Sequence, residues 1–296
     1  TLVLSGANNS GFSGGLSLNE GTVRVSGGAA LSDIGAVTLA NKTNAVLDLN
    51  NGTETIGSLA GGGFLGDTLG AGVVAGTITA GGTVAIGTGT LTVNQTGNTT
   101  FAGNLTGTGA LVVTGTAQGN TLTLNTASST FSGTLTVNRA QLALANGSLT
   151  NGASFANLPN VGAITVSNGG GLNIDNSGAY YSIDRINPAS TISLQNTGAS
   201  ATVATVGLNY TSDQSNLLTP RVQNVGAVTL AGGANTIRVN ANGTAALAQL
   251  NLASLTRTNW STLTLLASSM EDPLSDRRGL VTLSADANIV AALVGT

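Results

Sequence analysis

The chain has no cysteine and no histidine, and charged residues make up only 7% of its 296 positions. The first two absences exclude a disulfide framework, a thiolate nucleophile, a Cys/His zinc site and a Ser-His-Asp triad. Nine Lys and Arg against twelve Asp and Glu give a net charge of −3. Binding of nucleic-acid phosphates requires clustered basic side chains. We therefore predict no nucleic-acid partner, and nothing in the composition calls for a cofactor.

Long hydrophobic runs are also missing. None approaches the roughly 18 residues that a membrane-spanning helix needs, so we predict no membrane span. The sequence begins at Thr1, inside the strand-like pattern Leu2-Val3-Leu4. We therefore expect residues 1–296 to form one segment of a longer chain.

The chain is rich in glycine, with 43 residues, and in short runs where apolar and polar residues alternate. Thr22-Val23-Arg24-Val25 and Thr90-Leu91-Thr92-Val93 are examples, and Asn-Gly or Gly-Gly pairs follow many of these runs. Alternation with a period of two is typical of β-strands with one buried face. Glycine and asparagine supply the positive φ angles that tight corners require. The pattern predicts an all-β protein built of short strands.

Two motifs recur along the sequence. A Gly-Ala-Val/Ile-Thr motif begins at Gly35, Gly162 and Gly226. Self-similarity of this kind is typical of repeat architectures, so we interpret the motif positions as structural. The second motif, Phe-x-Gly-x-Leu, contains three of the five phenylalanines, and its copies are Phe12, Gly14 and Leu16; Phe101, Gly103 and Leu105; and Phe131, Gly133 and Leu135.

Two architectures fit short strands with glycine-rich turns: a right-handed parallel β-helix and a string of tandem β-sandwich modules. Sandwich cores usually pack around an aromatic anchor, whereas aromatic residues are 3% of this chain and Trp260 is its only tryptophan. We therefore favour the β-helix, or β-solenoid, with about 20 residues per coil. At about 4.8 Å between stacked strands, about 14 or 15 coils would form a rod about 70 Å long.

The regularity of the pattern changes near residue 170. We expect residues 1–170 to form regular repeat coils and residues 171–296 to form less regular coils with longer loops. The later part contains all three tyrosines and three of the four prolines. Both parts are expected to belong to a single solenoid.

Residues 2–16, which read LVLSGANNSGFSGGL, resemble the autotransporter-associated β-strand repeat. The run from Glu20 to Val25 is similar to the Gly-Thr-Leu/Val coil of that family, and Ile56 to Gly63 is similar to the close of its repeat. The resemblance implies a β-helical passenger that is secreted and displayed outside the cell. It therefore predicts an extracellular or bacterial cell-surface location.

Enzymatic chemistry finds little support in the sequence. The twelve acids are scattered, and their local cluster at Glu271, Asp272 and Asp276 is interpreted as solvated loop charge, with bound calcium left open. Polysaccharide-degrading sites need grouped carboxylates, so we predict that the chain is not an enzyme. The weak candidates for contact with carbohydrate are two stacking rings and two adjacent charged residues: Tyr180, Tyr181, Asp184 and Arg185.

The hypothesis that follows is a structural segment of a secreted bacterial surface fibre, sheath or adhesin. Stacked coils give a stiff rod with open ends, and open strand edges must be paired or covered. The expected partners are further repeats of the same chain or further copies of it, joined end to end or laterally, and surface polysaccharide. The alternative is a polysaccharide-binding or polysaccharide-degrading β-helix.

Overall fold

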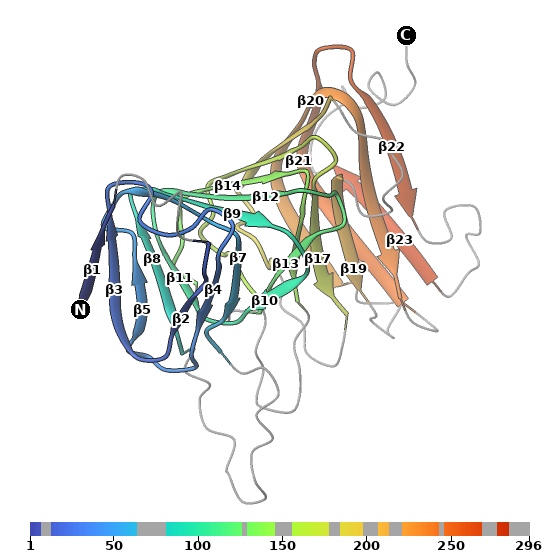
Figure 1. Ribbon diagram of the computed structural model, residues 1–296. Helices are drawn as coiled ribbons and strands as arrows, with labels where there is room; N and C mark the ends of the chain where they lie inside the picture. The colour runs from blue at the N-terminus through green and yellow to red at the C-terminus, as the bar shows by residue number, and fades with distance from the viewer. Residues whose placement is uncertain are drawn as a thin grey trace, which may run out of the picture.

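The computed structural model describes residues 1–6, 13–63, 81–125, 129–145, 156–177, 184–197, 207–212, 221–242, 246–267 and 277–283. All regular elements in these ranges are strands, and every strand pairing is parallel. Sandwiches are built from antiparallel strands, so the sandwich alternative is wrong. The prediction of an all-β parallel β-helix is confirmed (Figure 1).

The helix has three sides, and the chain passes repeatedly from side A to side C to side B. Side A begins with β1 (Leu2–Ser5), β3 (Gly21–Ser26), β5 (Ala45–Asp48), β8 (Thr83–Gly87) and β11 (Asn104–Gly107). Side C contains β6 (Thr53–Ile56), β9 (Thr90–Gln95), β12 (Ala110–Gly115), β14 (Thr134–Asn138), β16 (Ala163–Ser167) and β18 (Thr191–Asn196). Side B contains β2 (Leu16–Leu18), β4 (Ala36–Leu39), β7 (Ser58–Gly61), β10 (Thr99–Phe101), β13 (Thr121–Leu124), β15 (Gln141–Leu144), β17 (Gly171–Asn176), β19 (Gly207–Ser212) and β22 (Thr262–Ala267).

Long strands turn the corners at the C-terminal end. The strand β20 (Arg221–Ala241) follows side A up to Val225, pairs with β18 on side C, and pairs with β19 on side B. The strand β21 (Ala246–Arg257) pairs with the first half of β20 on one edge. On its other edge it pairs with β23 (Arg277–Leu283). Between β11 and β20, side A is continued by irregular chain, in which Leu158 and Ile186 form a parallel bridge.

The coils are longer than the sequence suggested. The sequence separation of paired residues on neighbouring coils ranges from 20 to 40 positions. Thr90 and Ala110 are an example of the shortest separation, and Gly61 and Phe101 of the longest. In the described ranges, the ladder of side B has ten strands, which corresponds to about 43 Å at about 4.8 Å per step. The expected 14 or 15 coils and 70 Å were therefore too high, because long connections between strands consume residues without adding coils.

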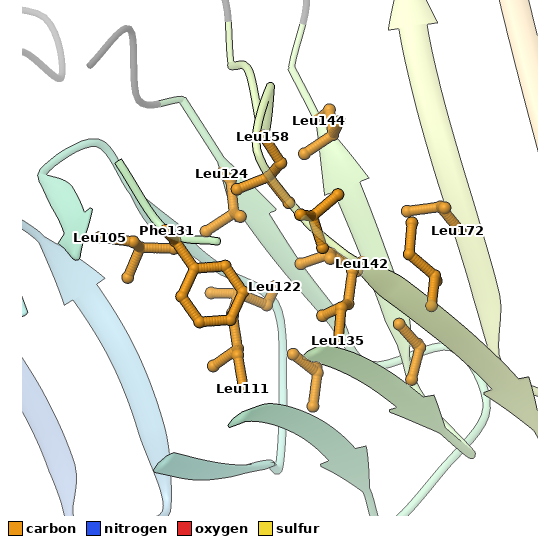
Figure 2. Packing of buried hydrophobic residues seen from close by; sticks show 14 of the residues in the cluster. Leu105, Leu111, Leu122, Leu124, Phe131, Leu135, Leu142, Leu144, Leu158 and Leu172 are labelled. Atoms are coloured by element: carbon orange, nitrogen blue, oxygen red, sulfur yellow. The ribbon is translucent and has the colours of Figure 1, made fainter. Parts of the chain in front are cut away.

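The core is a set of apolar files that run along the helix axis. Alternate residues of each strand point inward, and the parallel register places like residue above like. On side C one such file is Leu91, Leu111, Leu135, Ile164, Ile192 and Val228, all buried. Figure 2 shows the leucines of sides B and C meeting Phe131 and Leu158 in the interior. Full burial of each such side chain contributes about 1.5–3 kcal/mol.

The Phe-x-Gly-x-Leu motif combines a phenylalanine that fills the interior with a glycine at a tight corner. Phe101 and Phe131 are fully buried, and a Cβ at Gly133 would overlap the carbonyl oxygen of Gly109 on the neighbouring coil. The motif does not mark one fixed place in the coil, however. Residues 101–105 turn from side B to side A, whereas residues 131–135 turn from side A to side C. Phe12 lies outside the described residues, and Gly14 precedes Leu16, the first residue of β2.

Candidate functional site

The corner where side B passes to side A holds a buried polar cluster in the C-terminal half of the helix. Its members come from the ends of β17 and β19, from the start of β20 and from the irregular chain of side A. They are the fully or nearly buried residues Asn176, Arg185, Tyr210, Arg221 and Gln223. Other buried polar residues in these coils, such as Ser190 and Asn235, are short, so this corner is where the large buried polar side chains gather.

Arg185 is the centre of this cluster and has no exposed surface. Its Nε donates to the carbonyl oxygen of Ala156 at 2.8 Å and to Oδ1 of Asn157 at 3.1 Å. Its Nη1 donates to the carbonyl oxygen of Asp175 at 2.6 Å, and Nη2 donates to that of Ala145. A buried charge is tolerable only when its donors are satisfied, and here main-chain oxygens from two neighbouring coils satisfy them.

Burial lowers the pKa of the Arg185 guanidinium to about 10, although the nearby charges of Asp175 and Tyr210 oppose this shift. The side chain is therefore still a cation at neutral pH. Burial also raises the pKa of the Tyr210 phenol, whose oxygen accepts a hydrogen bond from Nδ2 of Asn176 at 3.1 Å. Arg221 lies nearby and donates through Nη1 to the carbonyl oxygen of Asn176 at 2.7 Å.

A ladder of amides runs along the outside of side A in the same coils. The Oδ1 of Asp184 accepts hydrogen bonds from the main-chain N–H and from Nδ2 of Asn224, at 2.9 and 2.8 Å. Asn251, which is paired with Asn224 on the next coil, donates to Oδ1 of Asn224 at 2.8 Å. Thr282 on the last described strand donates to Oδ1 of Asn251. The ladder presents amide and hydroxyl groups at regular strand spacing.

A second amide ladder runs along side B, in which Gln141 and Asn209 are buried and Asn173 is partly exposed. Asn173 donates to Oε1 of Gln141 at 3.0 Å, and Asn209 donates to Oδ1 of Asn173 at 2.9 Å. Arg238 is the next residue in this file. On the earlier strands of side B the same file consists of small residues, including Thr100, Thr123 and Ala143. This file of side B therefore becomes strongly polar only from β17 onward, and Asn209 within it is covered.

The structure separates the residues that the sequence suggested for carbohydrate contact. Asp184 is partly exposed and begins the side A ladder, but Arg185, its neighbour, points inward and is not available to an external ligand. Tyr180 and Tyr181, and also Glu271, Asp272 and Asp276, lie outside the described residues. The ladder members Asn224, Asn251 and Asn209 were not singled out beforehand, because only the coil register brings them into one file.

The remaining described surface carries little charge. Its ion pairs are Arg24 with Asp48 at 2.8 Å and Lys42 with Glu20 at 2.9 Å, both near the N-terminal end. Side C presents two outward files of mainly threonine, which include Thr90 and Thr92 on β9 and Thr134 and Thr136 on β14. In the described ranges no three metal-binding side chains gather. The described part of the chain also contains no helix long and apolar enough to cross a membrane. The threonine files of side C present hydroxyl groups that can form hydrogen bonds.

Comparison with known proteins gives one informative likeness. Over 185 residues the chain is 34% identical to the adhesin BmaC autotransporter of Brucella suis biovar 1. The match covers 60% of this chain but 5% of that adhesin, so the chain spans about a twentieth of the length of its relative. No protein-family model matches the chain. No solved structure matches it either.

Proposed function

We propose that this chain is a structural segment of a bacterial surface adhesin, a β-helical passenger of the autotransporter type. The observation that carries the proposal is the likeness to an autotransporter adhesin in a chain that folds as a parallel β-helix. The same likeness supports an extracellular or cell-surface location. The resemblance of residues 2–16 to the autotransporter-associated β-strand repeat is in keeping with it. In this role the segment is not an enzyme, and it needs no cofactor.

The segment would act as a stiff rod that extends by stacking. At the N-terminal end, β1 is paired on one edge only among the described residues, with β3. Leu2 and Val3 on this strand are 57% and 54% exposed, although Leu2 lies directly above the buried Val23. An exposed apolar edge strand readily pairs with another strand. We propose that it stacks against further coils, either of the same polypeptide or of another copy.

Negative-stain electron microscopy of the purified protein at several concentrations tests the rod and its stacking. Long filaments or rods joined end to end are expected if copies stack. Single short rods at every concentration would mean that only coils of the same polypeptide cover the edge. Compact globules would contradict the rod altogether.

Adhesion is tested by coating beads with the protein and counting the beads retained by cultured animal cells. Retention above that of beads coated with heat-unfolded protein is expected for an adhesive segment. Retention equal to that of the unfolded coat would restrict the proposal to a structural role.

A second candidate function is binding of surface polysaccharide, which the amide ladder of side A favours. The NH₂ groups of Asn224 and Asn251 carry two donors each, of which the ladder contacts use one, and a second N–H suits sugar hydroxyls. Native electrophoresis through gels that contain a neutral glucan would show retardation of the protein. Asn224→Ala should reduce that retardation, whereas Thr165→Ala on side C serves as the matched surface control. No retardation by neutral or acidic glycans would remove this candidate.

A further inference from the structure

The corner from side B to side A and the corner from side A to side C differ in how much chain they contain. In one coil the connection from side B to side A is short and runs only from Phe101 to Asn104. In later coils the steps are from Leu144 to Ala156, from Asn176 to Asp184 and from Ser212 to Arg221. The corner between sides B and A therefore accommodates large differences in length between successive coils.

The corner from side A to side C is the opposite case. It is short in each of these coils, as in the step from Gly107 to Ala110. Successive glycines stack here so closely that a Cβ at Gly89 would overlap the carbonyl oxygen of Gly52, and one at Gly109 would overlap that of Gly89. A close backbone approach of this kind leaves no space for additional chain.

We propose that Arg185 is a positioning residue, a clasp that lets the connections at the B-to-A corner change in length and sequence without opening the coils. Its guanidinium binds the carbonyl oxygens of Ala145 and Ala156, the residues that flank the connection 146–155. It also binds the carbonyl oxygen of Asp175, close to where the next connection begins, and Arg185 itself follows that connection. One side chain thus holds the bases of two successive connections.

The next coil repeats the arrangement. Arg221 is the second arginine of the corner and follows the connection 213–220. It binds the carbonyl oxygen of Asn176, at the base of the connection that precedes Asp184. In both cases an arginine on one coil binds a main-chain carbonyl oxygen at the base of the connection on the coil before it.

The physical reason lies in the main-chain oxygens at the corner. At the ends of β15 and β17 the described strand ladder stops, and a buried carbonyl group without a donor destabilises the fold. A guanidinium carries five donors in one plane and can serve several carbonyl groups at once, whereas the lysine ammonium is a single point with three donors. The clasp therefore makes coil closure independent of what the connection contains. If the proposed adhesive function holds, this corner is where recognition sequences can diverge, but the clasp itself does not depend on that function.

The test combines an insertion with removal of the clasp. A flexible Gly/Ser segment is inserted between Thr150 and Asn151, in the parent chain and in Arg185→Met, and the melting temperature is measured. With Arg185 present we expect a fall of about 2 °C, because lengthening a loop has a small entropic cost. In Arg185→Met the fall on insertion should be clearly larger, and protease should cleave the corner on the order of tenfold faster than in the parent chain with the same insertion.

Two controls make the result specific. The same segment inserted between Thr108 and Gly109, at the A-to-C corner, should abolish cooperative melting. Arg257→Met, at an exposed arginine, should leave the effect of the Thr150 insertion unchanged. If Arg185→Met does not fold, Asn157→Ala, which removes one acceptor of the guanidinium, replaces it and should enlarge the effect of the insertion to a lesser degree. Strict additivity of insertion and substitution would overturn the clasp, and so would unfolding on insertion with Arg185 intact.

Discussion

Glu54 on β6 shows how a single buried side chain can stabilise an irregular part of the stack. Its side chain is fully buried, and its two carboxylate oxygens accept the N–H groups of Ala30 and Leu31, each at 3.0 Å. We predict that Glu54→Gln lowers the free energy of unfolding by about 1–3 kcal/mol, because the amide NH₂ of glutamine would face a main-chain donor. Urea unfolding measures the change. Glu20→Gln, at an exposed ion pair, is the control, and equal effects of the two changes would contradict the prediction.

Tyr210 makes stability depend on pH at the alkaline end. Burial raises the pKa of its phenol, so above about pH 10 the unfolded chain releases this proton more readily than the folded chain does. The stabilisation is complete below the unfolded pKa and is lost as pH rises through the folded one. We predict that Tyr210→Phe loses less stability than the parent chain between neutral and strongly alkaline pH, as measured by urea unfolding at each pH. If the free energy of unfolding changes with pH in the same way in the two proteins, Tyr210 has the same pKa in the folded and unfolded chain, which would contradict the prediction.

At the scale of the element, the glycine-lined corner between sides A and C is expected to be the least tolerant of substitution. A Cβ at Gly109 would overlap the carbonyl oxygen of Gly89, which belongs to the main chain and cannot rotate away. We predict that Gly109→Ala destabilises the protein by about 3 kcal/mol or more. Gly97 has open space around its Cβ position, so Gly97→Ala is the matched control and should be nearly neutral. Thermal melting followed by circular dichroism compares the two, and similar melting temperatures would contradict the argument.

At the scale of the whole molecule, a solenoid is a one-dimensional stack in which each coil contacts its neighbours. Thr90 pairs with Ala110 on the next coil, so deletion of residues 90–109 removes one whole coil. Thr90 and Ala110 each follow a glycine, so the new junction still has a glycine at the corner. We predict a folded, cooperatively melting protein with a modestly lower melting temperature. Deletion of residues 90–99 joins side A directly to side B and should prevent folding, as judged by circular dichroism. If both deletions fold equally well, the coil is not the structural unit.

Much of the architecture could be read from local patterns. The alternation in segments such as Thr90-Leu91-Thr92-Val93 decides which side chains are buried, because successive residues of a strand point to opposite faces. Low aromatic content and glycine-rich corners pointed correctly to a β-helix. The expected number of coils was too high, because nothing local tells how many residues separate one strand from its partner on the next coil.

The sequence by itself determined that the chain folds as short β-strands around an apolar core, since side-chain alternation and corner glycines are properties of neighbouring residues. Only the tertiary structure decided which residues of different coils meet. It placed Arg185 in the interior rather than on the surface, and put copies of one motif at different corners. It also brought Asn224 and Asn251, 27 positions apart, into one ladder. The physical reason is that coil register depends on the length of every connection between two strands, a sum over the chain that no local motif records.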